Sequence, residues 1–384
     1  MSNEFIFPLP ARADSLQVVN QLLEHMVRMK GSDLFLLGNG EVWVSRYGKN
    51  VRITNRKLSD TEVKNLLGLI YNQSAPSMLG AAQPIDTAHE FVIESEENSK
   101  FTRERFRFRV NAVGCLRNSR KSLTVTMRTI PTTPPHWEKY GVEPEIIEVT
   151  RNLDQGLILV VGATGNGKST LLASILRDRL ETEDSHTNMV TIEHPIEFVY
   201  DEIKMPSSFS SQLQVGSDVK SFHEGVVNSL RMAPKIILVG EARDFETVQA
   251  TLEASMTGHG VFSTVHANNI PETFQRLVYV YPEEMQAQAK LDVLQPMKMI
   301  VAQRLIPTVD GGRTAIRELM IFDQQHKEQM IGSGNIALEA FKLVDAHGRP
   351  MIVDAQEKLR QGIISPEVFK RIEMNYSSMK QRAK

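Results

Sequence analysis

The stretch from residue 156 to residue 170 combines residue types and spacing that suit the binding of a nucleoside triphosphate. It reads Gly-Leu-Ile-Leu-Val-Val-Gly-Ala-Thr-Gly-Asn-Gly-Lys-Ser-Thr, an apolar run followed by a glycine-rich turn and a helix-forming run. The part from Gly162 to Ser169 fits the Walker A pattern G-x-x-x-x-G-K-[ST], whose backbone N–H groups cradle phosphate oxygens. We therefore expect a phosphate loop between a buried strand and a helix whose positive end faces the anion.

Two side chains of this loop have specific expected roles. Lys168 is expected to reach the β- and γ-phosphates, and Ser169 to hold a magnesium ion. ATP and magnesium are therefore the predicted cofactors. The predicted nucleotide-binding residues follow one another in the chain: Gly162, Ala163, Thr164, Gly165, Asn166, Gly167, Lys168, Ser169 and Thr170. The loop by itself does not indicate what the energy of the phosphate bond is used for.

Two glutamates follow apolar runs that read as strands, at the strand ends where ligands gather in open parallel sheets. Glu193 follows the run 189–192, and Glu241 closes the run that begins at 236, as in a Walker B motif. Hydrolysis of a phosphate bond requires a metal ion and a carboxylate that positions the attacking water. We therefore predict both glutamates as catalytic, with Glu241 as a magnesium ligand beside Ser169 and with Glu193 as the residue that activates water.

Two histidines, His259 and His266, bracket a third short apolar run. We include them, with Lys168, among the candidate catalytic residues. The alternative is a structural role, because a neutral imidazole often only bridges backbone groups. A zinc site is not expected, because Cys115 is the one cysteine of the chain and few histidines stand at metal-binding spacing.

Four arginines alternate with apolar residues in the segment 103–110, so that a strand here would be apolar on one face and cationic on the other. The arginines are Arg103, Arg105, Arg107 and Arg109. They suit either a solvated strand face or a surface that faces phosphate, because guanidinium groups match phosphate oxygens bidentately. The residues alone leave both interpretations open.

The elements that carry these residues alternate between strand and helix in the second part of the chain, which predicts a parallel sheet covered by helices. The expected strands are 157–161, 189–192, 236–239 and 261–265, and the expected helices are 169–180, 218–231 and 246–256. After Pro271 we expect mostly helix. In the first part we expect a helix at 15–30, a hairpin of 34–37 with 42–44, a third strand at 51–53, a helix from 61 to about 71 capped by Asp60, and strands at 91–93, 101–110 and 123–128.

Prolines concentrate between these two parts and predict an interdomain linker. Pro131, Pro134, Pro135 and Pro144 fall within the linker that we predict at 131–145. The predicted domains are then 1–130, an ATPase core at 146–310 and a mostly helical extension at 311–384.

Composition excludes several classes of protein. With 384 residues, 41% hydrophobic and 23% charged, the chain is globular rather than disordered or fibrous. A net charge of −2 provides no overall basic field, so a nucleic acid is not expected as a direct ligand. No apolar run approaches the length of a membrane span, and the start of the chain is unlike a secretory signal. The unpaired Cys115 fits a reducing cytosol.

The ordered motifs resemble those of the secretion ATPases, the family that includes the pilus-retraction motor PilT and the type II and type IV secretion ATPases. The resemblance covers the Walker A loop, an "Asp box" at 191–197, Walker B at 236–244 and a "His box" at 257–266. Arg107-Phe108-Arg109-Val110-Asn111-Ala112 and Arg128-Thr129-Ile130-Pro131 look like the arginine motifs of the family, and Gln303-Arg304-Leu305 like its post-core signature.

The resemblance implies a PAS-like N-terminal α/β domain, a RecA-like P-loop ATPase domain and a homohexameric ring. It also implies that Arg109 and Arg128 act on the nucleotide of a neighbouring subunit. Partners would be the cytoplasmic face of an inner-membrane secretion complex and other secretion ATPases, with the protein cytoplasmic and peripherally attached to the membrane through them.

The chain departs from the family pattern at three places, of which the tail bears on the branch. His194 stands where the family usually has Asp, and Ala242 replaces a larger apolar residue. The tail lacks the stretch associated with pilus retraction and is rich in Gln and Lys at 324–330. The chain looks most similar to the DotB/TraJ branch, which implies an ATPase that powers type IVB secretion or conjugative transfer. The alternatives are a pilus-retraction motor and, from another class, a nucleic-acid-translocating ATPase.

Overall fold

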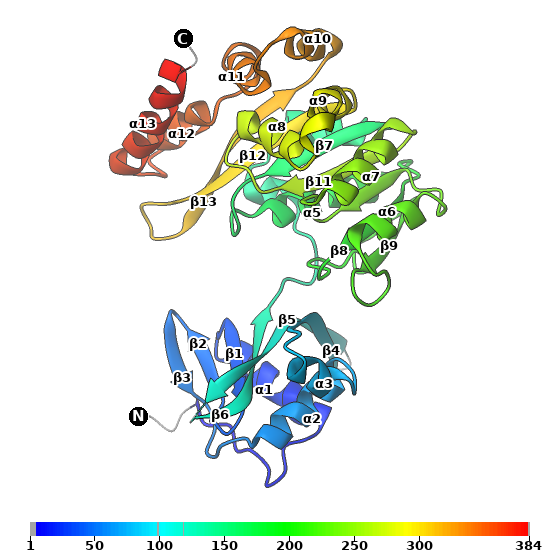
Figure 1. Cartoon of the computed structure of the whole chain (residues 1–384). Helices are drawn as coiled ribbons and strands as arrows, with labels where there is room; N and C mark the ends of the chain where they lie inside the picture. Colours follow the sequence, from blue (N-terminus) through cyan, green and yellow to red (C-terminus); the bar gives the residue numbers. More distant parts are fainter. Residues whose placement is uncertain (1–4, 98–99, 118, 383–384) are drawn as a thin grey trace. The chain divides into compact units, whose positions relative to one another are not determined.

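The computed structural model describes residues 5–97, 100–117 and 119–382. The chain divides into two compact units, Met1–Thr132 and Thr133–Lys384, each with its own hydrophobic core (Figure 1). The division falls inside the proline-containing segment. We describe each unit by itself.

Over its described residues, the N-terminal unit is an antiparallel sheet of six strands in the order β3-β2-β1-β6-β5-β4, with three α-helices. Its core joins buried side chains of the helices and strands, among them Leu22, Leu66 and Phe108. The strands are β1 (Asp33–Leu37), β2 (Trp43–Arg46), β3 (Lys49–Arg52), β4 (Ile85–Glu97), β5 (Lys100–Arg117) and β6 (Arg120–Thr129), and the helices are α1 (Leu16–Arg28), α2 (Asp60–Ile70) and α3 (Ala75–Gly80). Every element expected from the sequence of this part is present, and β4 and β5 are longer than expected.

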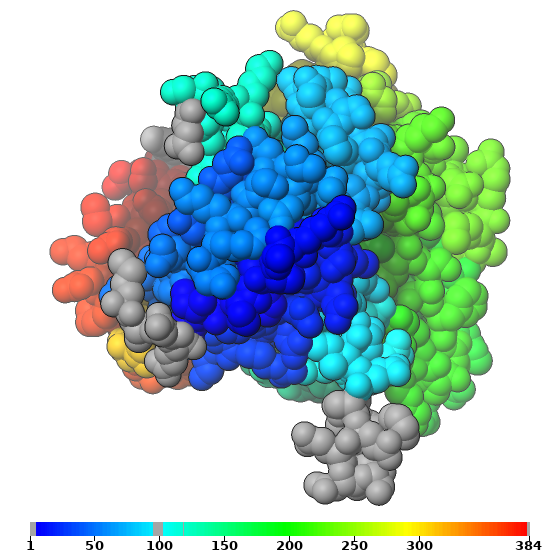
Figure 2. Space-filling view, turned by 90° about the horizontal axis from the view of Figure 1, so that it is seen from below, coloured from blue at the N-terminus to red at the C-terminus, as the bar shows by residue number. Residues whose placement is uncertain are grey.

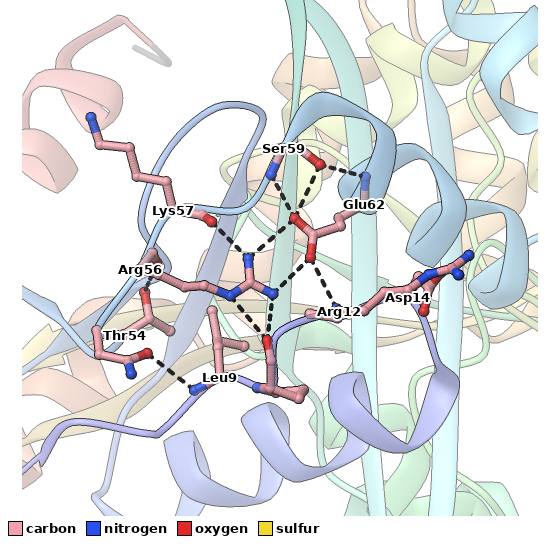
Figure 3. Close-up of polar contacts among 11 residues, drawn as sticks. Leu9, Arg12, Asp14, Thr54, Arg56, Lys57, Ser59 and Glu62 are labelled. Atoms are coloured by element: carbon pink, nitrogen blue, oxygen red, sulfur yellow. Dashed lines mark hydrogen bonds and ion pairs between the residues drawn. The ribbon is translucent and has the colours of Figure 1, made fainter.

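The segment that precedes α1 is fastened to the start of α2. Arg56 donates from Nη2 to the carbonyl oxygen of Pro10 at 2.6 Å and to Glu62 at 2.7 Å, and Glu62 accepts the N–H of Ala13 at 2.9 Å (Figure 3). In Figure 2 the first described residues, in the darkest blue, lie on the outside of this unit. We call the side chains of Arg56 and Glu62 the N-terminal clamp.

The start of α2 differs from the prediction by one residue. Ser59, not Asp60, is the N-cap, and its hydroxyl accepts the N–H of Glu62 while Glu62 accepts the N–H of Ser59 in a capping box. Such a reciprocal pair satisfies two backbone donors at once, which a cap at Asp60 would not do. Asp60 instead accepts hydrogen bonds from Asn39 and Ser122.

The C-terminal unit is built on a sheet of seven strands in the order β13-β12-β7-β11-β10-β8-β9. The pairs from β12 to β9 are parallel, and β13 is an antiparallel edge strand on β12. The strands are β7 (Gly156–Val161), β8 (Asn188–Glu193), β9 (Phe209–Gln214), β10 (Ile236–Val239), β11 (Gly260–Val265), β12 (Met297–Pro307) and β13 (Arg313–Ile321). All six residues of β7 are buried, as a central parallel strand covered on both faces requires.

Helices cover both faces of this sheet. One core holds side chains of α4 and α5 beside Ile158 and Val160, and the other holds side chains of α6 to α9 beside Leu159 and Val161. The helices are α4 (Pro144–Arg151), α5 (Lys168–Glu181), α6 (Phe222–Ser229), α7 (Phe245–Met256), α8 (Ile270–Tyr279), α9 (Gln286–Leu294), α10 (Gln324–Gly332), α11 (Ile336–His347), α12 (Met351–Arg360) and α13 (Pro366–Arg382), with 3₁₀ helices η2 (Trp137–Tyr140) and η3 (Glu283–Met285).

The prediction of mostly helix after Pro271 is wrong for residues 297–321. These residues form β12 and β13, a long hairpin that joins the sheet beside β7 (Figure 1). Most of Met297–Pro307 is buried, with Lys298, Arg304 and Pro307 exposed, because the strand lies between two other strands. Its apolar run therefore belongs to a sheet and not to a helix. The chain becomes helical to its end only from α10 onward.

Candidate functional site

The phosphate loop connects the buried strand β7 to the helix α5. Gly165 and Gly167 have φ angles of +79° and +75°, a left-handed conformation that glycine adopts without steric cost. Gly167 is the N-cap of α5 and provides no side-chain cap. The first-turn N–H groups of this helix are therefore free of a capping side chain and suit an anion such as a phosphate group.

The strand β12 also contacts the loop. A Cβ atom at Gly162 would lie 2.5 Å from the carbonyl oxygen of Gln303 in β12, so only glycine fits there. The amide Nε2 of Gln303 donates to the carbonyl oxygen of Asn166 at 2.7 Å. The loop is thus held between β7 and β12.

Lys168, the first residue of α5, is buried against the same loop. Its Nζ donates to the carbonyl oxygens of Gly162 at 3.0 Å and Ala163 at 3.3 Å. Burial lowers the pKa of its ammonium group, although the carboxylates of Glu241 and Glu197 oppose this shift. The ammonium group is therefore held at the loop by backbone oxygens, which a phosphate can replace.

Glu241 lies at the same edge of the sheet, directly after β10. Its Oε1 is 3.1 Å from Nε2 of His266, and its Oε2 is 3.7 Å from Nη1 of Arg243. Burial and the positive charge of Lys168 both lower the pKa of His266. A neutral His266 can donate one hydrogen bond to Glu241 without neutralising its charge.

Glu193 is the last residue of β8 and is buried. Thr191 donates to its Oε1 at 2.7 Å, and the N–H of Glu197 donates to its Oε2 at 3.3 Å. Burial raises the pKa of this carboxyl to about 7, and the hydrogen bonds oppose the rise. A carboxylate with this pKa can take up a proton near neutral pH. His194, the next residue, is exposed.

The donor set fits a magnesium ion that is bound together with a nucleotide. Ser169 is in the first turn of α5, and Glu241 follows β10 on the same edge. Over the described parts of the chain, no group of three or more His, Cys, Asp and Glu side chains could hold a metal ion by itself. Magnesium is usually bound by one or two protein ligands together with substrate phosphates, and these two residues suit that mode.

Comparisons with known proteins identify the family. The family model "Type II/IV secretion system protein" matches residues 12–374. The chain belongs to this family.

Solved structures and a characterised relative agree with this assignment. The ATPase DotB of Legionella pneumophila is 38% identical with a TM-score of 0.87, and the match covers 97% of this chain and 100% of that one. The pilus retraction motor PilT with bound ADP is 27% identical with a TM-score of 0.73, covering 92% and 95%. The type IV pilus ATPase PilU of Pseudomonas aeruginosa is 32% identical over 78% of this chain and 74% of its own length.

The chain is therefore an ATPase of the secretion and pilus family, and the predicted α/β fold with a RecA-like parallel sheet is confirmed. A nucleotide is its expected ligand. No helix in the described ranges is both long and apolar enough to cross a membrane.

His259 lies at the other edge of the sheet of this secretion ATPase. It precedes β11, beside Gly156 at the start of β7, whereas the phosphate loop follows the end of β7. The six-residue strand separates the two edges by about 20 Å. His259 Nδ1 contacts the carbonyl oxygen of Ala254 at 3.1 Å. Within one chain His259 is therefore distant from the phosphate loop, while His266 lies beside Glu241.

Arg109 and Arg128 are brought together in the N-terminal unit. They are opposite each other in the antiparallel pair of β5 and β6, so their side chains share one face of the sheet. Arg109 pairs with Asp86, and Arg128 Nε donates to Asp33 at 2.6 Å. Their side chains are 44% and 68% exposed. Arg107, two residues before Arg109 on β5, also has an acidic partner but is buried, and its Nε donates to Glu90 at 3.0 Å.

Most of the residues described next lie near the site but were not marked by any sequence motif. Gln212 on β9 donates to Glu193 at 3.4 Å, and β9 itself was not expected. A cavity of about 570 Å³ lies beside the phosphate loop and reaches α13, lined in part by Asn268, Gln303, Glu318 and Met379. Burial raises the pKa of Glu318 to about 7. The only sequence signal among these residues was Gln303, in the post-core signature.

Proposed function

We propose that this chain forms a hexameric ring whose hydrolysis of ATP powers a type IVB secretion or conjugative transfer machine. The observation that carries the proposal is the likeness to DotB, which spans the whole of that chain and 97% of this one at a TM-score of 0.87. The likeness to PilT is lower at 0.73. The C-terminal helices are included in this extent, so the resemblance is not limited to the ATPase core that all these motors share.

The geometry supports a different role for each of the site residues. Lys168 and the N–H groups of 163–170 bind the phosphates. Ser169 and Glu241 would hold a magnesium ion, which would supply charge stabilisation at the terminal phosphate. Glu193 accepts a proton from the attacking water, because its raised pKa suits a base near neutral pH. His266 orients Glu241.

The arginine pair supports assembly into a ring. Arg109 and Arg128 are in one compact unit and the phosphate loop is in the other. Each arginine has an acidic partner that a phosphate group could replace. We propose that the pair acts on the nucleotide of a neighbouring subunit, and that the ring docks on the cytoplasmic face of an inner-membrane secretion complex together with other secretion ATPases.

The second candidate function is pilus retraction. It is favoured by the relatives PilU and PilT of Pseudomonas aeruginosa, the latter 39% identical over 56% of this chain and 60% of its own length. The tail is evidence against pilus retraction, because it lacks the stretch associated with retraction. Residues 324–330, which form most of α10, are rich in Gln and Lys instead. The coupling of hydrolysis to mechanical work is common to both candidates.

Deletion of the gene in its host separates the candidates. We expect loss of conjugal transfer or of protein secretion, restored by the wild-type gene and not by Lys168→Ala. Loss of surface-pilus retraction with normal secretion would support the second candidate instead. The nucleic-acid-translocating alternative is tested by ATPase assays with single- and double-stranded DNA, since several-fold, salt-sensitive stimulation would favour it.

A further inference from the structure

A chain of hydrogen bonds begins at Asn166, in the middle of the phosphate loop. Its carbonyl oxygen accepts from Gln303 Nε2 at 2.7 Å, and its side-chain Oδ1 accepts from the N–H of Leu305 at 3.2 Å. Asn166 lies between the two glycines with left-handed conformations, Gly165 and Gly167. Residues of β12 therefore hold the loop at Asn166, between the two glycines.

The next link is Arg317, which stands opposite Gln303 in the antiparallel pair of β12 and β13. Its Nε donates to Gln303 Oε1 at 2.8 Å. Because a guanidinium group only donates and a carbonyl oxygen only accepts, these two partners fix the orientation of the Gln303 amide. Gln303 is 4% exposed and Arg317 is 2% exposed.

The terminal nitrogens of Arg317 contact the last residue of η2 and the residues that follow it. Its Nη1 donates to the carbonyl oxygen of Gly141 at 2.9 Å and to Glu143 Oε2 at 3.0 Å, and its Nη2 donates to the carbonyl oxygen of Tyr140 at 3.2 Å. The buried Glu143 also accepts from Arg349 at 3.0 Å. The phosphate loop is thus connected to residues 140–143 through two buried side chains.

The same stretch of chain is attached to α5. Trp137 Nε1 donates to Asp178 at 3.0 Å, and Arg177 donates to the carbonyl oxygen of Pro134. The helix α5 starts at Lys168 of the phosphate loop. Residues 134–143, which begin directly after the boundary between the two units, therefore contact both the helix that starts at the loop and the hydrogen-bond chain that supports it.

We propose that Gln303 and Arg317 are positioning residues that hold the phosphate loop in its binding shape and make that shape depend on residues 134–143. A displacement of the N-terminal unit would then change nucleotide affinity through this stretch. The proposal rests on the proposed function as an ATPase. A buried polar network suits such a role, because removal of one member leaves its buried partners unsatisfied and lets the segment they hold relax.

The first test is the affinity of the full-length protein for ADP, measured by calorimetry below the unfolding temperature. Gln303→Leu should weaken binding by about 3- to 10-fold, the effect that loss of the buried hydrogen bond to the loop at Asn166 has on a binding equilibrium. Gln303→Glu keeps an acceptor for Arg317 but removes the donor to Asn166, so it should weaken binding at least as much. Unchanged affinity in both variants would overturn the proposal.

Arg179 provides a matched control. It is buried in the same unit and donates to the carbonyl oxygens of Thr150 at 2.6 Å and Leu153 at 2.8 Å. It lies on α5 about 16 Å from Lys168, at 1.5 Å per residue. Arg317→Lys and Arg179→Lys should lower the melting temperature alike, but only Arg317→Lys should weaken ADP binding. Equal losses of affinity would mean general destabilisation and would overturn the proposal.

A double-mutant cycle tests the connection to the interdomain stretch. Glu143→Gln should weaken ADP binding less than Gln303→Leu, and the double variant should match Gln303→Leu alone, because both changes break one chain. If the two substitutions weaken ADP binding independently, so that their effects multiply in the double variant, the proposed connection between Glu143 and Gln303 would be overturned. A wild-type protein that binds no ADP would reject the proposed function, whereas normal wild-type binding with unaffected variants would reject only this inference.

Discussion

At the scale of single residues, the two glutamates of the site differ in environment more than in position. Glu193 is buried and its pKa is raised to about 7 by burial. Glu241 is half-buried and faces His266 and Arg243, and its side chain is 24% exposed. Two carboxylates in such different surroundings are suited to different tasks, one as a proton acceptor and the other as a metal ligand.

Lys168→Ala should abolish ATP hydrolysis and leave the fold intact. The ammonium group contacts two loop carbonyl oxygens and no core side chain through hydrogen bonds, so its loss removes phosphate contacts and little stability. Turnover should fall below detection, while circular dichroism and the melting temperature stay near those of the wild type. Wild-type turnover in this variant would contradict the assignment of the site.

Glu193→Gln should lower kcat by about 100-fold or more, the usual contribution of a general base, and leave ADP affinity nearly unchanged. Because the pKa of Glu193 is raised to about 7, its basic form gains population as pH rises through 7. The wild-type kcat should therefore rise between about pH 6 and pH 8, and this rise should be absent in the variant. A loss confined to affinity would transfer the role of base to Glu241.

Glu241→Gln should trap bound nucleotide instead. The amide preserves the shape of the carboxylate but weakens the contact with magnesium and the alignment of water. Retention of radiolabelled ATP on the protein after gel filtration measures the effect. Rapid turnover by this variant would count against Glu241 as a magnesium ligand.

The sequence located the residues whose position follows from a strand end, and it missed those positioned by tertiary pairing. Glu193 and Glu241 follow apolar runs, and parallel strands bring such ends to one edge. His259 precedes its strand, and the same rule places it at the opposite edge. Arg317 could not be predicted as a support of the loop, because its role depends on the register of β12 with β13.

At the scale of elements, local patterns predicted all the parallel strands except β9 and β12. The run Ile236–Val239 is short and apolar, lies between Lys235 and Gly240, and β10 has the same bounds. β9 is polar, Phe-Ser-Ser-Gln-Leu-Gln, because it is an edge strand, so no apolar run marked it. The apolar run in β12 is compatible with a buried helix or a buried strand, and only its place beside β7 decides between them.

The N-terminal clamp should make the stability of α2 depend on pH in the acidic range. Burial opposes ionisation of Glu62, but Arg56 and the N–H groups of Ser59 and Ala13 outweigh it and lower the pKa to about 2. A lowered native pKa stabilises the fold above the ordinary pKa of 4.5, and this contribution is lost as pH falls toward 2. Glu62→Gln should therefore cost about 1–2 kcal/mol at neutral pH, a typical value for a lost cap, and much less near pH 3.

Fluorescence can follow this unit alone. Trp43 is in β2 and the second tryptophan, Trp137, is in the other unit, so a Trp137→Phe background leaves one local probe. Denaturant unfolding followed at Trp43 should show the difference between Glu62→Gln and its parent. Glu24→Gln is the control, since Glu24 lies on α1 outside the clamp and pairs with Arg28 at 3.5 Å. An equal loss in both variants would argue against the clamp.

At the scale of the whole molecule, the candidate catalytic residues are divided between two units. Lys168, Glu193 and Glu241 are in the C-terminal unit, and Arg109 and Arg128 are neighbours on β5 and β6 of the N-terminal unit. A hexamer offers many interfaces across which an arginine of one subunit can meet the phosphates of another. Removal of such an arginine typically lowers turnover by about 10³- to 10⁵-fold.

Hydrolysis should therefore depend on assembly. Specific activity per chain should rise with protein concentration as rings form, with light scattering as the parallel measure of mass. Lys168→Ala and Arg109→Ala chains should each be nearly inactive. Mixed together, they should regain part of the activity, because an intact loop on one subunit then meets an intact Arg109 on its neighbour. Mixtures that never exceed the sum of their parts, or a monomer active at the full rate, would mean that the arginines act within one chain or not at all.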